Sequence, residues 1–171
     1  FIFTGCARQV HQAVRDGNVE RVSQLLDSGS DVNAIESSGA AEVFYGGKRL
    51  EYTPLHWAAF LGDLQIVKLL VSKGADLNPL DHSYGTPLHL AAEQARVEVV
   101  KFLLNKGARV NVSNPYWGHT PLHRAAWGPV VRRFGQEAKD LGADPNPDYK
   151  NIIALLVAEG AEINVRDHEG E

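Results

Sequence analysis

The chain has 171 residues, of which 44% are hydrophobic and 22% charged, a composition typical of a globular protein with enough apolar side chains for one continuous core. Its formal net charge is −4 with the two signs interspersed. This argues against a nucleic-acid partner, because binding to phosphates normally needs a basic stripe. A single Cys excludes an internal disulfide and a thiolate metal cluster, and no run reaches the roughly 18 apolar residues of a membrane span.

We interpret residues 1–5, FIFTG, as a truncated apolar leader or cap in front of Cys6. An apolar run, small residues and then a Cys resemble the end of a bacterial lipoprotein signal, and this resemblance implies lipidation of Cys6. The alternative is a hydrophobic cap, or the remnant of an earlier hairpin, with Cys6 as a small buried residue. The first alternative implies a periplasmic, membrane-anchored protein, and the second leaves a cytoplasmic one open.

A helix, a turn and a second helix are predicted between residues 53 and 78, TPLHWAAFLGDLQIVKLLVSKGADLN. Thr53 suits an N-cap and Pro54 the first helical position, where its missing N–H costs nothing. Gly62 then ends the first helix, because glycine tolerates the left-handed conformation. The second helix ends at Gly74 and carries four apolar side chains at helical spacing on one face, Ile66, Val67, Leu69 and Leu70.

The same order of residue types returns along the chain with a fixed period. Thr53 and Thr86, Gly74 and Gly107, and Asn78 and Asn111 are each 33 residues apart. A single hairpin could not bury its apolar face, so the copies must stack on one another. The segments TPLHWAA, TPLHLAA and TPLHRAA, each with its Leu pair, its Gly-Ala dipeptide and a closing Asn, resemble the ankyrin repeat. This resemblance implies an all-α repeat solenoid of stacked helix-turn-helix units joined by β-hairpin loops.

The repeats divide the chain into segments of unequal regularity. Repeat 1 is degenerate, and its polar substitutions are those required of a terminal, capping repeat. We predict repeat 1 at residues 6–34, an inserted β-hairpin finger at 35–52, repeat 2 at 53–85, repeat 3 at 86–119, repeat 4 at 120–164 with an inserted segment at 129–147, and the start of a truncated repeat 5 at 165–171.

The inserted finger is predicted to be a β-hairpin, since Gly46-Gly47 suits a two-residue turn and the flanking residues favour strands. Pairing outward from that turn sets Ala41 against Tyr52. One face of the ribbon would then carry an apolar surface that either folds back on the neighbouring repeat or contacts a partner. The side chains of this face are Val43, Tyr45, Leu50 and Tyr52.

The inserted segment of repeat 4 begins at Gly128-Pro129, a pair that we expect to end the first helix. A short extra amphipathic helix is predicted next, because apolar residues recur at spacings of 4, 4 and 3 before Gly142. The second helix of the repeat then resumes near Tyr149. The apolar residues of the predicted extra helix are Val130, Phe134, Ala138 and Leu141.

One His occurs at the same place in each repeat, and this row of imidazoles invites a metal-binding interpretation. Stacked repeats would hold the rings roughly 10 Å apart, whereas Zn–N bonds are about 2 Å, so no metal site is expected. The resemblance instead implies a structural His that bonds the backbone of the adjacent turn. We find no nucleophile with an orienting partner and no glycine-rich phosphate loop, and therefore expect neither an enzyme nor a cofactor. The row consists of His11, His56, His89 and His123.

The resemblance places the recognition surface on the hairpin tips and on the exposed positions of the first helices, where a protein or peptide partner would bind. Aromatic side chains concentrate there, as at the centres of protein interfaces. The alternative for Trp57 is that it fills a gap between first helices, and for Trp127 that it packs under the inserted segment. We expect a monomer. The predicted partner-binding residues are Tyr45, Tyr52, Phe60, Leu61, His82, Ser83, Gly85, Glu93, Gln94, Tyr116, Trp117, His119, Arg124 and Trp127.

Two other functions remain open. An Asn that follows a Leu by eight residues resembles the context in which ankyrin-repeat asparagines are hydroxylated, with an Asn that caps the turn as the structural alternative. The second alternative is that the chain is the regulatory array of a larger enzyme or effector. The candidate hydroxylation sites are Asn33, Asn78, Asn111 and Asn164.

Overall fold

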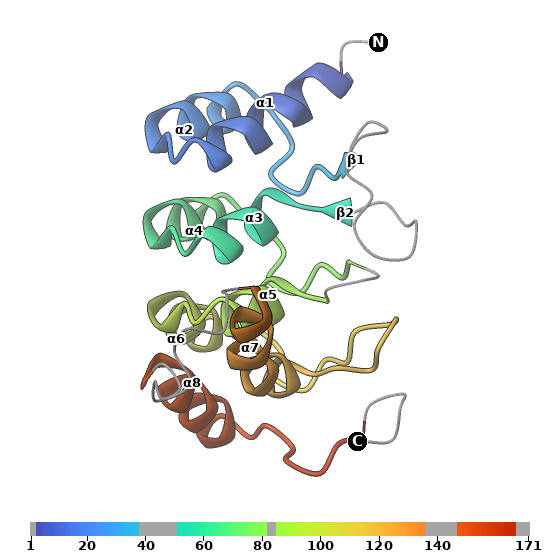
Figure 1. Cartoon of the computed structure of the whole chain (residues 1–171). Coiled ribbons are helices and arrows are strands. Elements are labelled where there is room, and N and C mark those ends of the chain that lie inside the picture. Colours follow the sequence, from blue (N-terminus) through green and yellow to red (C-terminus); the bar gives the residue numbers. More distant parts are fainter. Residues whose placement is uncertain (1–2, 38–50, 82–84, 136–146, 167–171) are drawn as a thin grey trace.

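A computed structural model of the chain describes residues 3–37, 51–81, 85–135 and 147–166. In this part of the chain the helices form hairpins that stack in chain order, with the first helices in one layer and the second helices in another (Figure 1). This arrangement is the predicted all-α repeat solenoid. The hairpins are α1 (Phe3–Arg15) with α2 (Val19–Asp27), α3 (Pro54–Leu61) with α4 (Leu64–Ser72), α5 (Pro87–Glu93) with α6 (Val97–Asn105), and α7 (Pro121–Gly135) with α8 (Pro147–Ala158).

The first helices of repeats 2 and 3 begin and end as the sequence predicts. Thr53 and Thr86 are their N-caps, and each main-chain N–H donates to the Nδ1 atom of the His three residues on. After α3, Gly62 adopts the left-handed conformation with φ of 82°. Ala95 holds the corresponding place after α5 and takes φ of 55°, although a side chain disfavours this conformation.

The core lies between the two helix layers. Small residues on the first helices, among them Ala58 and Ala91, are fully buried and let the second helices approach. The predicted apolar face of α4 is confirmed for Ile66, Val67 and Leu70, while Leu69 is only partly buried. The equivalent buried side chains are Val99, Val100 and Leu103 on α6, and Ile152 and Leu156 on α8.

The base of the inserted finger pairs in a different register from the predicted one. Strand β1 (Glu36–Ser37) lies antiparallel to β2 (Glu51–Tyr52), and the partner of Tyr52 is Glu36, so the predicted pairing of Ala41 with Tyr52 is wrong. The prediction counted outward from a turn, whereas the observed pairing is at the base, where Tyr52 is held by repeats 1 and 2. The Gly46-Gly47 turn and the rest of residues 38–50 lie outside the described residues.

Helix α7 runs through Gly128-Pro129 to Gly135, so the prediction that this pair ends the first helix is wrong. Pro129 follows Thr120 by nine residues, as Gly62 follows Thr53 and Ala95 follows Thr86. Those two residues turn the chain with positive φ, but a proline ring fixes φ near −65°. The left-handed stop is therefore unavailable, and the first part of the inserted segment continues the helix. The predicted extra helix extends into residues 136–146, which are outside the described part.

At the other end, α1 starts at Phe3, so residues 3–5 and Cys6 belong to the backbone of this helix. Within the described residues, none of the helices combines the length and the apolar character that crossing a bilayer demands. Lipidation of Cys6 stays a prediction.

Candidate functional site

The His row ties each repeat to the next one. The Nε2 atom of each of three rings donates to a main-chain carbonyl that lies one residue ahead of the next N-cap position, as the family resemblance implied. All three rings are fully buried. The bonds run from His11 to the Tyr52 carbonyl (2.9 Å), from His56 to the Gly85 carbonyl (3.0 Å) and from His89 to the His119 carbonyl (2.9 Å).

The tautomer of two of these rings follows from their neighbours. The main-chain N–H of Thr53 donates to Nδ1 of His56 at 3.1 Å, and that of Thr86 to Nδ1 of His89 at 3.0 Å, so the proton of each neutral ring is on Nε2. Burial lowers the pKa of His56 to about 4 and that of His89 to about 3. Both rings are neutral at pH 7, with both nitrogens engaged in structural bonds.

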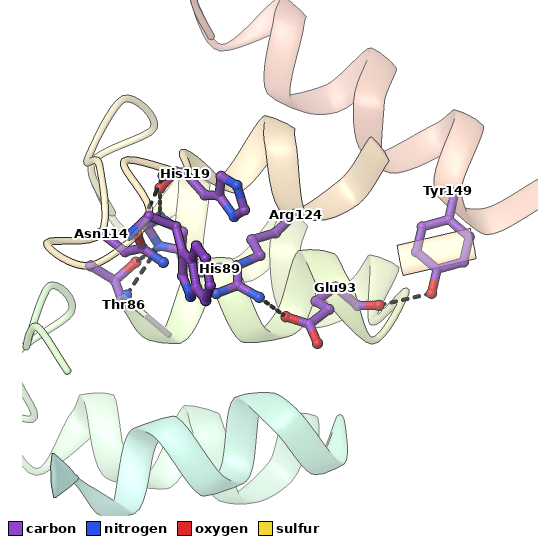
Figure 2. A network of polar contacts seen from close by, with 8 residues as sticks. Thr86, His89, Glu93, Asn114, His119, Arg124 and Tyr149 are labelled. Carbon is purple, nitrogen blue, oxygen red and sulfur yellow. Dashed lines mark hydrogen bonds and ion pairs between the residues drawn. The ribbon is translucent and has the colours of Figure 1, made fainter. Parts of the chain in front are cut away.

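Glu93, at the end of α5, accepts hydrogen bonds from repeat 4 through both its side chain and its main chain (Figure 2). Its Oε2 atom accepts from the Arg124 guanidinium at 3.0 Å, and the side chains are 14% and 7% exposed. Its carbonyl accepts from the Tyr149 hydroxyl at 2.7 Å. A Cβ atom at Gly128 would lie 2.3 Å from the Tyr149 ring, so only glycine there leaves room for this contact.

The same carbonyl position is also bonded one repeat earlier. Phe60 precedes Glu93 by 33 residues, and its carbonyl accepts from Nε of Arg96 at 3.1 Å. Arg96 and Tyr149 both precede a core Leu, Leu103 or Leu156, by seven residues. Each therefore satisfies a carbonyl that the end of the preceding first helix leaves without an intrahelical partner.

Two positions of neighbouring first helices contact each other at each junction, and we call these contacts the inner pairs. One member is the residue directly after the row His. The other member comes from the preceding repeat, four residues after its own row His. The Arg15 guanidinium lies over the Trp57 ring, 5.1 Å from its centroid. Phe60 packs in the cluster formed by Leu90 and Tyr52, and Glu93 pairs with Arg124. One position thus carries cation–π, apolar and ionic contacts in turn.

Four aromatic rings form a continuous cluster at the junction of repeats 3 and 4, which we call the aromatic tip: Tyr116, Trp117, His119 and Trp127. Tyr116 meets Trp117 edge-on with ring centroids 4.6 Å apart, and Trp117 stacks on His119 at 6.2 Å. The Trp127 ring meets His119 edge-on at 5.2 Å. Tyr116 is 42% and Trp127 44% exposed, so two of the four rings of the tip are open to solvent.

Asn114 closes the loop that carries the aromatic tip through hydrogen bonds of its side chain and its main chain. Its buried side-chain oxygen accepts from the main-chain N–H groups of Trp117 at 2.9 Å and His119 at 3.3 Å. Its own N–H donates to the His119 carbonyl at 2.8 Å, the group that also receives His89. The exposed rings are therefore anchored through the loop to the buried His row, as Figure 2 shows for Asn114, His119 and His89.

Several residues predicted to bind a partner are buried, and the prediction of an exposed side chain is wrong for them. Tyr52 is 5% exposed because its ring stacks on His56, and for this residue the burial agrees with the alternative that the apolar face of the finger folds back on the neighbouring repeat. Arg124 is 5% exposed because it pairs with Glu93, and His119 lies between two tryptophans. Gly85 is also buried, and a Cβ atom there would lie 2.8 Å from the His89 ring.

The other predicted residues fall into three groups. Leu61, Tyr116 and Trp127 are exposed. Phe60, Glu93, Gln94 and Trp117 are partly buried. Tyr45, His82 and Ser83 lie outside the described residues. Trp57 is half-buried between Tyr52 and Phe60, in agreement with the interpretation that it fills a gap. Sequence reasoning missed Asn114, Arg96 and Tyr149, although the shared spacing of the last two from a core Leu was a usable signal.

The closing asparagines form a second row of bonds between repeats. The side-chain oxygens of Asn33, Asn78 and Asn111 each accept from a main-chain N–H in the turn of the following repeat. The three bonds run from Asp76 to Asn33 (2.9 Å), from Arg109 to Asn78 (2.8 Å) and from Glu162 to Asn111 (3.0 Å). The structural role of these side chains is thus defined, and their hydroxylation stays a prediction.

A family model for ankyrin repeats matches residues 10–114 and 55–167, with 3 copies. The chain belongs to the ankyrin-repeat family. It is 40% identical over 67 residues to Acyl-CoA-binding domain-containing protein 2 of Arabidopsis thaliana and 43% identical over 65 residues to the 2-5A-dependent ribonuclease of Mus musculus. A putative ankyrin repeat protein of Fowlpox virus is 35% identical over 68 residues. These matches cover 38–40% of this chain and 7–16% of the relatives, so the chain spans only a small part of their length.

Proposed function

We propose that this chain is a non-catalytic module that binds a protein or peptide on the face formed by its first helices and hairpin tips, with the aromatic tip at the centre. Ankyrin repeats are generally protein–protein interaction modules. The proposal rests on one observation, the contiguous rings of the aromatic tip, of which Tyr116 and Trp127 are exposed and Trp117 is partly buried. Rigid aromatic side chains bury a large area at a small entropic cost and dominate the energetics of protein interfaces.

The anchoring of the tip supports this site over the other exposed apolar residues. The loop is closed by four hydrogen bonds of Asn114, and its His119 carbonyl is bonded by the buried His row. A partner would therefore meet rings that are already ordered, which limits the entropy lost on binding. Leu61 and the partly buried Phe60 lie on α3, which is separated from α7 by α5, and they add apolar side chains to the first-helix layer. We expect the partner to be neither nucleic acid nor a second copy.

The experiment compares two variants that each replace one aromatic ring by an aliphatic side chain. Trp117→Leu removes a ring of the tip, whereas Phe102→Leu removes a half-buried ring from α6 in the second-helix layer. A partner captured with the wild-type chain is titrated calorimetrically against both. We expect Trp117→Leu to weaken binding by about 2 kcal/mol and Phe102→Leu to leave the affinity unchanged. Equal affinities for the three proteins would remove the tip from the binding site.

A second role, as the regulatory array of a longer enzyme or effector, is favoured by how little of its relatives the chain spans. The 2-5A-dependent ribonuclease is an enzyme by name and matches over only 7% of its length. In that role the same surface would hold either a neighbouring domain or an effector. Sequencing of the complete reading frame tests it, since a catalytic domain in the same frame is the expected result.

A further inference from the structure

Each repeat offers three contact groups to the repeat that follows it. The first is Nε2 of the row His, which donates to a carbonyl ahead of the next first helix. The second is the side-chain oxygen of the closing Asn, which accepts from an N–H of the next turn. The third is the side chain four residues after the row His, which we call the inner side chain. It contacts the residue directly after the row His of the next repeat. Repeats 1, 2 and 3 use all three groups.

Repeat 4 presents the same three groups, and they remain open in the described part of the chain. His123 is positioned like the other row rings, with Nδ1 bonded to the Thr120 N–H at 3.1 Å. Its Nε2 atom meets no hydrogen-bond partner among the described residues, and the ring is half-buried where the other three are fully buried. Asn164 is exposed, and so is Trp127, the inner side chain of this repeat.

Apolar side chains of repeat 4 are exposed at positions that are covered in the preceding repeat. Val157 and Leu104 are 53 residues apart, as are Ile163 and Val110 and the closing residues Asn164 and Asn111. Leu104 is buried and Val110 partly buried against the core, whereas Val157 and Ile163 are exposed. The difference at each position is the area that a following repeat covers.

We propose that this end face of repeat 4 docks a further helical hairpin of the same repeat type, supplied by the continuation of this chain. The hairpin would bring a carbonyl for His123, a main-chain N–H for Asn164 and a side chain that packs on Trp127. The residues after Asn164 support this source. Val165-Arg166-Asp167 follows Asn164 as Pro79-Leu80-Asp81 follows Asn78, and both segments end in Asp. In that earlier segment Asp81 pairs with Gly85 and so places the carbonyl that receives His56.

A second copy of the chain fits the face less well. The residue four before the row His supplies the carbonyl in repeats 2, 3 and 4. Its counterpart in repeat 1 is Ala7, which lies inside α1, where carbonyls bond the N–H four residues on. The residue directly after the row His, which would meet Trp127, is moreover the polar Gln12 in repeat 1. Repeat 1 therefore lacks two of the three complementary groups.

The test extends the chain by one repeat. Residues 86–111 are appended directly after Glu171, so that the added Thr follows Asn164 by eight residues, as Thr86 follows Asn78. We expect a single unfolding transition with a midpoint several degrees higher, and main-chain amides of α8 that exchange with solvent at least about tenfold more slowly. An extended chain that melts in two steps, with exchange in α8 unchanged, would overturn the proposal.

Point variants separate docking from a general effect of added length, and they leave the aromatic tip intact. Asn164→Ala should leave the midpoint of the 171-residue chain unchanged and remove much of the gain in the extended chain. Asn105→Ala, an exposed Asn at the end of α6 outside the Asn row, is the matched control and should keep the gain. Equal behaviour of the two variants in the extended chain contradicts the proposed register.

Sedimentation of the 171-residue chain decides between a continuation of the chain and a second copy. We expect a mass that does not change with concentration. Assembly into dimers or longer arrays that Asn164→Ala abolishes would assign the face to a second copy and overturn the proposal. Trp127 belongs both to this end face and to the aromatic tip, whereas Asn164 belongs to the end face alone. The results with Asn164→Ala therefore do not depend on a partner at the aromatic tip, and they can fail separately from the proposed function.

Discussion

The junction between repeats 2 and 3 and the junction between repeats 3 and 4 use the same positions with different chemistry. At the first, the inner contact joins Phe60 to the apolar cluster of Leu90. At the second, the homologous positions hold the buried ion pair of Glu93 and Arg124. The backbone contacts are alike at both, because a row His and a side chain that caps a helix carbonyl recur.

This difference distinguishes the contacts that hold neighbouring repeats together from the contacts that determine which repeat stacks on which. The bonds to the backbone recur at both junctions and do not depend on the side chain that accepts or donates in the neighbouring repeat, because the partner is a main-chain carbonyl. The inner pairs depend on both side chains, since Glu93 facing Leu90 or Phe60 facing Arg124 would leave a buried charge without its partner, which is strongly destabilising. The inner pairs therefore favour one order of stacking over others.

The largest effect is expected from removal of one member of the ion pair. Arg124→Met keeps the length of the side chain but leaves the Glu93 carboxylate buried without its cation. We expect a loss of about 4 kcal/mol in the free energy of unfolding, measured by urea denaturation at pH 7.5. A loss below about 1 kcal/mol would show that Glu93 reaches solvent when its partner is absent.

The double variant Glu93→Phe/Arg124→Leu transfers the chemistry of the earlier junction to this one and sharpens the comparison. Replacement of a buried ion pair by apolar side chains of similar volume is often neutral or stabilising. We therefore expect a stability within about 1 kcal/mol of the wild-type chain. The Tyr149 bond is preserved, because it is made to the main-chain carbonyl of residue 93.

Acid should weaken both junctions through the His row. The pKa of His56 is lowered to about 4 and that of His89 to about 3, in both cases mainly by burial. Below pH 6.5 the unfolded chain binds protons that the folded chain does not, so stability is complete above that pH and falls as the pH drops towards the folded-state values. We expect the two rings together to cost about 3 kcal/mol between pH 7.5 and 5.5.

Urea midpoints at the two pH values measure this loss, and nuclear magnetic resonance titration of the ring protons tests its origin. We expect the His56 and His89 signals to stay in the neutral form down to pH 5. Midpoints that are the same at pH 7.5 and 5.5, or rings that titrate near 6.5, would contradict the burial of the row.

The two carbonyl caps should contribute similar, smaller amounts. Tyr149→Phe removes only the hydroxyl that bonds the Glu93 carbonyl, and Arg96→Met removes the Nε–H that bonds the Phe60 carbonyl. Each is expected to lower the free energy of unfolding by about 1 kcal/mol. Lys68→Met, a change of an exposed cation on α4, is the control and should have little effect. A much larger loss for one cap than for the other would show that the two positions are not equivalent.

Regular parts of this fold follow from the sequence because each local signal has one physical outcome. The Thr-Pro starts, the apolar face of α4 and the His bonds to the adjacent turn are of this kind. The path of α7 could also have been derived, since Pro129 stands where positive φ is needed.

The candidate site was less predictable, because exposure depends on which residue stands opposite. Arg124 is a charged residue on an inner position, and only the presence of Glu93 in the preceding repeat buries it. Tyr52 is buried through its stack on His56, which the predicted register of the finger did not foresee. The rings of Tyr116 and Trp127 remain exposed as predicted.

The smallest effect is expected at Ala95, and it tests whether the stop after α5 is like the stop after α3. Ala95 has φ of 55° where Gly62 has 82°, and a side chain in this region costs about 1 to 2 kcal/mol. Ala95→Gly relieves that strain, while the greater freedom of glycine in the unfolded chain offsets about half of the gain. We expect a net stabilisation of up to about 1 kcal/mol. The reverse change, Gly62→Ala, should be clearly destabilising, because its Cβ atom would also lie 2.6 Å from Cδ of Arg96. Destabilisation by Ala95→Gly would mean that the packing of the Ala95 methyl group outweighs its backbone strain.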